Sequence, residues 1–193
     1  MKRVLKLIGA MVALAVVAAA ATLLWAWTHT DSALARRHAP PAIDIAPEVR
    51  SAPVATGERI AQVRNGCIDC HGRDLGGGRV VDDPLAGAIY APNITPAALR
   101  GWTDSEIAAA IRTGIGRDGR ALVVMPSYEY QHLSRDDLAA LIAYLRSVPE
   151  VERRMPPVRV GPVPRLLYAL GKLPTLLPAG MIDPSRGFAE KPH

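Results

Sequence analysis

The distribution of apolar and polar positions divides this chain of 193 residues into a long apolar start and a mixed remainder. From Leu7 to Trp27 there are 21 residues without a charge, and about 20 suffice for a helix that spans a bilayer. Lys2, Arg3 and Lys6 precede this segment, and Trp25 stands with Trp27 at its far end. Positive residues stay inside and aromatic residues gather at the membrane surface. The pattern therefore predicts one transmembrane helix, with the rest of the chain outside.

A cleaved signal peptide is the alternative for the same segment, since its apolar region runs about 7–15 residues before a small-residue site. Ala18-Ala19-Ala20 has the composition of such a site, but the apolar run continues beyond it. We therefore expect an uncleaved anchor. Under either interpretation the residues after Trp27 are exported. The expected location is the inner (cytoplasmic) membrane, single-pass, with the domain on the periplasmic side.

Beyond the apolar segment, proline-rich stretches flank a region with helical periodicity. Residues 28–54 contain several prolines, and such a segment predicts a semi-rigid tether of up to roughly 80 Å. An ordered arm that packs on the domain is the alternative. The expected units are an anchor or signal segment (1–27), a Pro-rich linker (28–54), one domain (55–150) and a Pro-rich extension (151–193).

The domain is expected to be all-α. Its first helix runs from about Thr56, as the N-cap, to Asn65, with Ile60 and Val63 on one buried face. Residues 79–101 contain Pro84, Pro92 and Pro96 and are expected to be irregular. The extension holds a short amphipathic piece, 165–170. We expect this piece to pack back on the domain, and a partner or membrane-surface contact is the alternative.

Two further helices of the domain have clear start signals. Thr103–Glu106 is a capping box, and Gly114 ends the helix that it opens. Ser134–Asp137 opens the last helix. The apolar residues of that helix follow the i, i+3, i+4, i+7 pattern of a buried face and are Leu138, Leu141, Ile142 and Leu145.

The chemistry of the chain is concentrated in Cys67-Ile68-Asp69-Cys70-His71. Two cysteines two residues apart, followed at once by a histidine, are the pattern for covalent attachment of a c-type haem. Each thiol can form a thioether with a vinyl carbon, and the imidazole can bind the iron. A structural zinc site needs four ligands, and the chain has no other cysteine. A thioredoxin-like redox pair would lie near a βαβ pattern, and the sequence shows none. A structural disulfide would give His71 no role.

Met125 is the expected second axial ligand. It lies in a loop between two predicted helices, 54 residues after His71, and Pro126 restricts the backbone beside it. A thioether suits the second axial position of an electron-transfer haem and raises its reduction potential. His132 is the competitor, and we expect it to face solvent. Core filling is the alternative role for any single methionine.

The net charge of +5 gives little information about partners. Beyond residue 29 the chain carries 20 basic against 18 acidic side chains, so the domain lacks the clustered basic charge of a nucleic-acid-binding protein. Two haem propionates would bring the balance near zero. Trp102, Arg112 and Arg120 are candidates to meet those propionates, with core packing as the alternative for Trp102.

Residues of about 55–150 resemble a class I cytochrome c domain. The resemblance rests on the Cys67–His71 motif, the Met125-Pro126 loop and a last helix with Tyr144. It implies His71 and Met125 as axial ligands, and it implies that Gly57 and Tyr144 lie near a shared helix crossing. Four shorter motifs resemble the cytochrome subunits of bacterial membrane-bound alcohol and gluconate dehydrogenases, and they are Pro92–Thr95, Gly101–Thr103, Arg112–Gly114 and Met125–Tyr128.

Those subunits typically carry three haem motifs, whereas this chain has one. We therefore expect an electron carrier, not an enzyme, with one covalent haem c. It would work between a dehydrogenase and the quinol or terminal-oxidase side of a respiratory chain. If Met125 does not bind, an open iron would make a gas sensor or a peroxidase-like protein. A structural subunit with an incidental haem is a third hypothesis.

Overall fold

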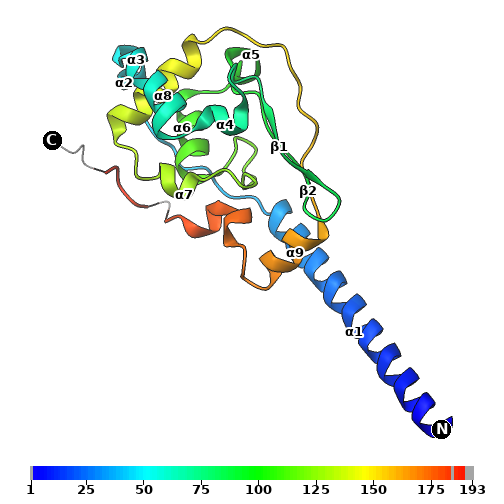
Figure 1. Ribbon diagram of the computed structural model, residues 1–193. Coiled ribbons are helices and arrows are strands. Elements are labelled where there is room, and N and C mark those ends of the chain that lie inside the picture. The colour runs from blue at the N-terminus through cyan, green and yellow to red at the C-terminus, as the bar shows by residue number, and fades with distance from the viewer. Residues whose placement is uncertain (1, 184, 190–193) are drawn as a thin grey trace.

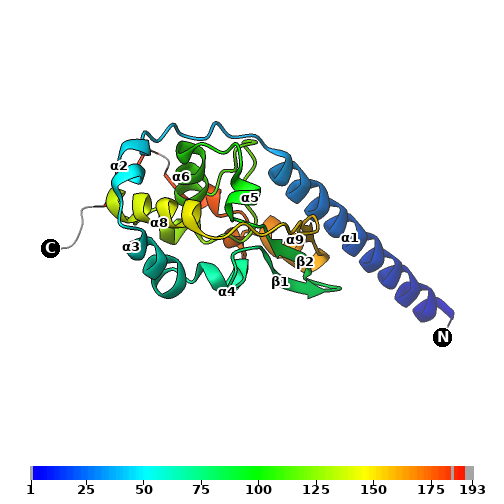
Figure 2. The same ribbon diagram turned by 90° about the horizontal axis from the view of Figure 1, so that it is seen from above.

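The computed structural model describes residues 2–183 and 185–189 and is mostly helical (Figures 1 and 2). The outer ends of the predicted N- and C-terminal segments therefore lie outside the described residues. The helices are α1 (Lys2–Ala35), α2 (Ala46–Ser51), α3 (Val54–Arg59), α4 (Cys67–His71), α5 (Pro96–Leu99), α6 (Asp104–Thr113), α7 (Ser127–Tyr130), α8 (Arg135–Ser147) and α9 (Pro162–Ala169). The strands are β1 (Gly78–Asp83), β2 (Gly87–Ala91) and β3 (Arg159–Val160), and single π or 3-10 turns span Ile60–Arg64, Pro174–Leu176 and Pro178–Met181.

Helix α1 is 34 residues long and continues past Trp27, where the apolar segment ends. Its N-terminal part projects away from the remaining chain (Figure 1). Within the described residues it is the single helix with the length and apolar composition to cross a membrane. Its last turns are different, because Ala26 and Thr30 are almost fully buried against the rest of the protein.

Residues 36–45 and α2 form an ordered arm along the domain and not a free tether. The N–H of His38 donates to the carbonyl of Gly119 (2.7 Å), and the N–H of Ile43 donates to Ser105 Oγ (2.9 Å). Ile45 is fully buried. The expectation of a tether is wrong for this stretch, because apolar residues between the prolines pack on the domain.

The main core lies between α3, α6 and α8. Helix α8 buries Leu138, Leu141, Ile142 and Leu145 as predicted, each with an exposed fraction of 4% or less. The capping box at the start of α6 is present, and Ser134 Oγ accepts from the N–H of Asp137 at the start of α8. Helix α3 crosses α8 at Gly57 and close to Tyr144, in agreement with the predicted crossing.

The first helix of the domain differs from its prediction. It begins at Val54 with Pro53 as the N-cap, so Thr56 is not the cap. It continues as a π-helical turn, in which the N–H of Asn65 donates to the carbonyl of Ile60 (2.9 Å). A π turn places one more residue in the turn than an α turn does, and this rotates the following side chains. Ile60 is therefore buried, but Val63 is 81% exposed.

The region 79–101 contains a β-hairpin, in contrast to the irregular structure that its prolines predict. Strand β1 pairs with β2 in antiparallel register, and β2 also pairs with β3 through Gly87–Val160 and Ala88–Arg159. The all-α prediction is therefore corrected to a mostly helical fold with a small three-stranded sheet. Strand β3 comes from the C-terminal extension, so a local pattern could not reveal this pairing.

The C-terminal extension wraps around the molecule. After α8 it passes along one side of the domain to β3 and then to α9, which lies beside α1 (Figures 1 and 2). Residues 165–170, which were expected to pack on the domain, pack on α1, and Tyr168 also joins an apolar cluster with Val123 and Val124 of the domain. The extension then returns to the domain, where the carbonyl of Leu176 accepts from the N–H of Val124 (3.0 Å).

Candidate haem site

The Cys67–His71 motif forms a single helical turn, α4, between two glycines. Gly66 and Gly72 have φ of 58° and 79°, values that glycine adopts without steric cost. Within the turn the two cysteines and the histidine are spaced i, i+3 and i+4. Positions with this spacing lie on one face of a helix. The local structure therefore presents two thiols and an imidazole to the same side.

That face lines a cavity of about 780 Å³, a volume within the range of protein cofactor sites. Cys67, Cys70, His71 and Met125 all line it, so the structure brings the four predicted residues together. Elements from the whole domain close the cavity. Its apolar lining comes largely from Ile89, Ile94, Leu99, Ile107, Ile111, Leu141 and Leu145.

His71 is buried, and its ring is fixed by the backbone. Its Nδ1 lies 2.7 Å from the carbonyl oxygen of Pro92, which assigns Nδ1 as the donor and leaves Nε2 as the acceptor. Burial lowers the pKa of His71, and the Pro92 carbonyl opposes that shift. Both the neutral ring and the backbone partner on the second nitrogen are typical of a histidine that binds a metal.

The two cysteines are half-buried thiols and are not bonded to each other. Burial raises the pKa of Cys67 to about 11, and burial also raises that of Cys70. A thiol exchange site instead needs a lowered pKa. Among the residues that the structure describes, no group of three or more His, Cys, Asp or Glu side chains could hold a metal ion. The donor set fits a covalently attached haem better than zinc or dithiol chemistry.

The Met125 loop is held from both ends. On one side the N–H of Ser127 donates to the carbonyl of Met125 (2.7 Å). On the other side Val124 has φ of +53°, an unusual conformation for a β-branched residue, and its N–H is bonded to Leu176. His132 is exposed, as expected, and is not among the residues that line the cavity.

Several residues at the cavity were not found from the sequence. Arg153, Arg154 and Met155 of the extension line it, and Arg153 forms an ion pair with Asp74 (2.8 Å). The extension is held there by Asn93, whose Nδ2 donates to the carbonyl of Arg153 (3.2 Å). The sequence signal for this contact was the motif Pro92–Thr95, which contains Asn93. The motif did not show that Asn93 binds the extension.

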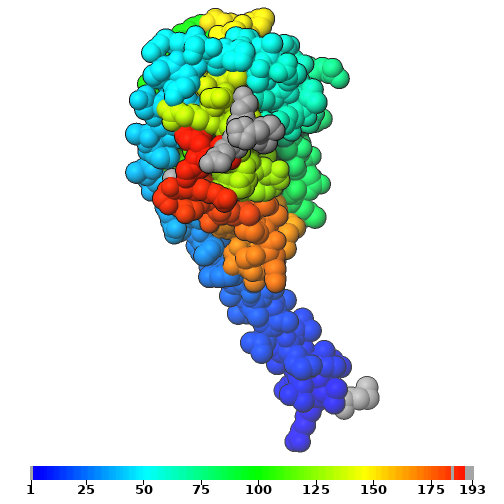
Figure 3. Space-filling view, turned by 90° about the vertical axis from the view of Figure 1, so that its left-hand side faces the viewer, coloured from blue at the N-terminus to red at the C-terminus, as the bar shows by residue number. Residues whose placement is uncertain are grey.

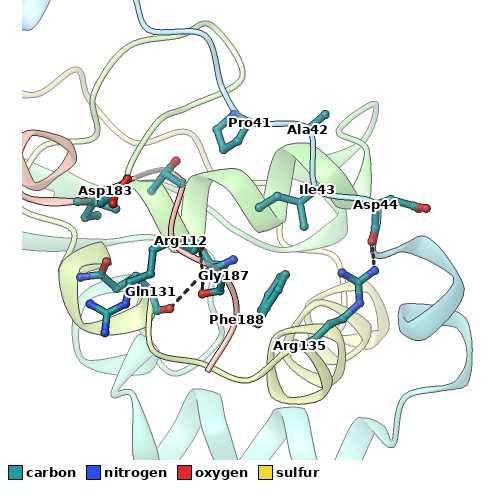
Figure 4. Close-up of a pocket in the computed structure, with 13 residues that line it drawn as sticks. Pro41, Ala42, Ile43, Asp44, Arg112, Gln131, Arg135, Asp183, Gly187 and Phe188 are labelled. Carbon is teal, nitrogen blue, oxygen red and sulfur yellow. Dashed lines mark hydrogen bonds between the residues drawn. The ribbon is translucent and has the colours of Figure 1, made fainter. Parts of the chain in front are cut away.

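The candidates for the propionates divide into two groups. Trp102 and Arg120 line the cavity, but Arg112 does not. Arg112 donates to the carbonyls of Arg186 (3.1 Å) and Gly187 (2.9 Å) and lies 4.0 Å from the ring of Phe188. Figure 4 shows this cluster in a separate, smaller pocket. The prediction for Arg112 is wrong, because the guanidinium is bound to the end of the extension.

Comparison with known proteins supports the resemblance predicted from the sequence. Residues 52–145 match the model of a family described as cytochrome C oxidase, cbb3-type, subunit III. The matched residues, just under half of the chain, are similar to a cytochrome c domain. It contains the motif turn, the Met125 loop and almost the whole of α8, and the resemblance predicted from the sequence is confirmed.

Three relatives illustrate the similarity. The alcohol dehydrogenase (quinone) cytochrome c subunit of Gluconacetobacter polyoxogenes is 35% identical over 106 residues, which cover 51% of this chain and 22% of that protein. The fructose dehydrogenase cytochrome subunit of Gluconobacter japonicus is 39% identical over 88 residues, 41% of this chain and 18% of that protein. The gluconate 2-dehydrogenase cytochrome c subunit of Pantoea cypripedii is 33% identical over 105 residues, 50% of this chain and 23% of that protein.

The matched region thus corresponds to about a fifth of the length of these relatives. The family match supports the prediction of a c-type haem. The three relatives are named as cytochrome subunits of dehydrogenases, which agrees with the predicted electron-transfer role. None of these three relatives is named as a gas sensor or a peroxidase. The cytochrome c domain therefore gives no support to the open-iron alternative.

Proposed function

We propose that this protein is a membrane-tethered electron carrier with one covalent haem c. Cys67 and Cys70 would form the thioethers, and His71 and Met125 would be the axial ligands. One observation carries the proposal. Two thiols and a backbone-fixed imidazole share one helical face and line the same apolar cavity as Met125.

A bound haem c supplies a one-electron couple between ferric and ferrous iron. The chain's own residues account for the rest of the function. Pro92 holds His71 in one orientation, so that Nε2 points to one position. Met125, which lines the same cavity, would supply the second ligand, and iron held by both residues would have no free site for a substrate. Apolar side chains of α6 and α8, among them Ile107, Ile111 and Leu141, line the cavity and would pack against the bound haem.

The proposed location and partners follow from α1 and from the relatives. Lys2, Arg3 and Lys6 would remain on the cytoplasmic side while α1 spans the inner membrane, with the cytochrome c domain in the periplasm. The named relatives are subunits of alcohol, fructose and gluconate dehydrogenases. A membrane dehydrogenase is therefore the proposed electron donor, and the respiratory chain, on its quinol or terminal-oxidase side, the proposed acceptor.

Expression with the haem maturation machinery tests the attachment site. The full chain should carry one haem that stays bound after denaturation, as measured by intact mass and by the pyridine haemochrome spectrum. Replacement of both cysteines, Cys67→Ala with Cys70→Ala, should abolish that covalent haem. A colourless wild-type chain of unmodified mass would overturn the proposal.

The substitution Met125→Leu tests the second ligand, because leucine keeps the apolar volume but cannot bind iron. We expect a low-spin spectrum with a sulfur-to-iron charge-transfer band in the wild type. The variant should become high-spin, should bind carbon monoxide at low concentration, and should have a lower midpoint potential. Met155→Leu is the matched control, since Met155 lines the same cavity. If only the control changes the spectrum, Met155 and not Met125 is the ligand.

A further inference from the structure

The end of α1 and helix α9 form a tightly joined pair. Arg165 of α9 is 8% exposed, and its Nη1 donates to Asp31 Oδ1 (2.7 Å). Thr30 Oγ1 donates to the carbonyl of Arg165 (3.2 Å), and the Arg165 guanidinium lies 4.1 Å from the ring of Trp27. These contacts fix α9 beside the point at which α1 leaves the domain (Figure 1).

The opposite side of α9 is apolar and exposed. Val163, Leu167 and Leu170 have exposed fractions of 44%, 37% and 52%. Their spacing of i, i+4 and i+7 puts them on one face of the helix. Arg165 points in the opposite direction, toward α1. The helix is therefore amphipathic with its polar side facing the protein. Its charged residue is buried and its leucines face outward.

The tip of the β1–β2 hairpin adds to the same region. Leu85 at this tip is 61% exposed, and its carbonyl accepts from the N–H of Val163 (3.2 Å). Trp25 and Trp27 on α1 are each 46% exposed. Three elements thus bring exposed apolar side chains to one end of the domain. We call this set the collar, and it consists of Trp25, Trp27, Leu85, Val163, Leu167 and Leu170.

The collar lies beside α1, at the point where the helix leaves the domain (Figure 1). Figure 3 shows the segment with α9, in orange, at the lower end of the domain against α1. The collar meets the exposed apolar surface of α1 at Trp25 and Trp27. The large exposed apolar residues from Val4 to Leu24 on α1 have exposed fractions of 49% to 73%. A surface that continues a bilayer-spanning segment has the bilayer as its nearest apolar environment.

We propose that the collar is inserted into the interfacial layer of the membrane that α1 crosses. The inference depends on the proposed function, in which α1 is a membrane anchor. Tryptophans at the end of a transmembrane helix occupy this layer, and an amphipathic helix buries its apolar face about 5–10 Å into it. Lys172, just after α9, is exposed and would lie near the lipid headgroups. The collar would hold the domain, and with it the haem cavity, in one orientation to the membrane surface.

The test uses the haem-loaded full chain in vesicles of phosphatidylethanolamine and phosphatidylglycerol. A fluorophore is attached to a new cysteine at Leu167 or at Leu85, because Cys67 and Cys70 are then thioethers and do not react. Val63→Cys is the matched control, since Val63 is 81% exposed and lies on the π turn after α3, away from α1. The haem spectrum confirms that each variant is folded.

Labels at Leu167 and Leu85 should be quenched by a nitroxide lipid several-fold more than the label at Val63, and the order should reverse for aqueous iodide. If all three labels respond equally to iodide while α1 stays in the membrane, the collar proposal is overturned and the anchor stands. A mature chain that begins after Ala20 and washes off the vesicles overturns both the collar proposal and the proposal that α1 is a membrane anchor. N-terminal sequencing of both the vesicle-bound and the washed-off protein separates the two outcomes.

Discussion

Val124 has a strained backbone conformation and directly precedes Met125, the proposed axial ligand. Its φ of +53° costs a non-glycine residue roughly 1–2 kcal/mol, and its N–H is tied to the carbonyl of Leu176. This conformation directs the next residue, Met125, toward the cavity. We infer that packing of the extension on the loop offsets the cost, because Val124 contacts the apolar cluster of Val160, Leu176 and Leu177.

Two substitutions at Val124 separate the free-energy cost of the positive φ from the contribution of the side chain. Both Val124→Gly and Val124→Ala remove the apolar side chain, but only glycine relieves the positive φ. We expect the glycine variant to be more stable than the alanine variant by about 1 kcal/mol, measured by denaturant unfolding of the haem-loaded protein. Equal stabilities, or a more stable alanine variant, would show that the loop carries no such strain.

At this scale the sequence predicted which residues of the motif share one cavity, but not which long side chains reach it. The roles of Cys67 and His71 follow from their spacing, because a single helical turn must place them on one face. Arg112 was assigned to the wrong pocket, since a charge pattern does not show which long side chain reaches which site. Met155 belongs to the Pro-rich extension by sequence, and the structure places it at the cavity.

Among the elements, the crossing of α3 and α8 depends on the absence of a side chain at Gly57. A Cβ at this position would lie 1.9 Å from the carbonyl oxygen of Ala140 and 2.7 Å from Cβ of Tyr144. Those atoms belong to helix backbone or lie directly on it, and they cannot move independently. The two helices approach each other closely enough that only glycine fits between them.

The substitution Gly57→Ala should therefore force α3 away from α8 and destabilise the domain by about 3 kcal/mol, the upper part of the range for overpacked cores. Unfolding by denaturant, monitored at the haem absorption, measures this loss. Gly180→Ala is the matched control, because a Cβ there meets no atom within 4 Å. A Gly57→Ala protein as stable as the control would mean that the helices can separate without cost.

The joint between α1 and α9 is a second element-scale contact that can be tested. Arg165→Met keeps the apolar stem but leaves the carbonyl of Val160, which accepts from Arg165 Nε (3.0 Å), without its partner. An unpaired buried group costs about 1–3 kcal/mol. Amide hydrogen exchange across α9 should rise by roughly tenfold or more, while α8 stays protected.

The carboxylate partner of Arg165 offers the matched comparison. Asp31 has a side chain that is 52% exposed, and exposed charge pairs contribute less than about 1 kcal/mol. Asp31→Asn should therefore loosen α9 less than Arg165→Met does. If Asp31→Asn loosens α9 more than Arg165→Met does, the ion pair with Asp31 holds the two helices together, and the hydrogen bond from Arg165 to Val160 does not.

At the scale of the whole molecule, the helical core was predictable and the wrapping of the C-terminal extension was not. Helices α6 and α8 have start signals and apolar periodicity within their own segments. Strand β3, helix α9 and the Leu176 contact each pair with a part of the chain far away in the sequence. The prolines of the extension indicated only that no long helix forms there, because they carry no information about what the segment covers.

Besides the Asn93 hydrogen bond, an ion pair holds the extension at the cavity, and this contact is sensitive to acid. Arg153 donates to Asp74 at 2.8 Å, and this contact, together with the N–H of Gly76, holds the pKa of Asp74 below its ordinary value of 3.8. A lowered folded-state pKa stabilises the contact fully at pH values above the ordinary pKa. The stabilisation is lost as the pH falls below about 4 toward the folded value.

We therefore expect amide exchange of residues 151–158, corrected for intrinsic rates, to rise as the pH is lowered from about 6 through about 4. In Asp74→Asn the exchange should be raised already at the higher pH and should show no further rise. Arg153→Gln should reproduce that result with the carboxylate still present. Exchange must be measured at residues 151–158 themselves, and not as global stability. Hydrogen bonds also lower the pKa of Glu106 and Asp183, so acid weakens contacts elsewhere in the chain as well. If Asp74→Asn retains the acid response of the wild type, another group controls how the extension closes over the cavity.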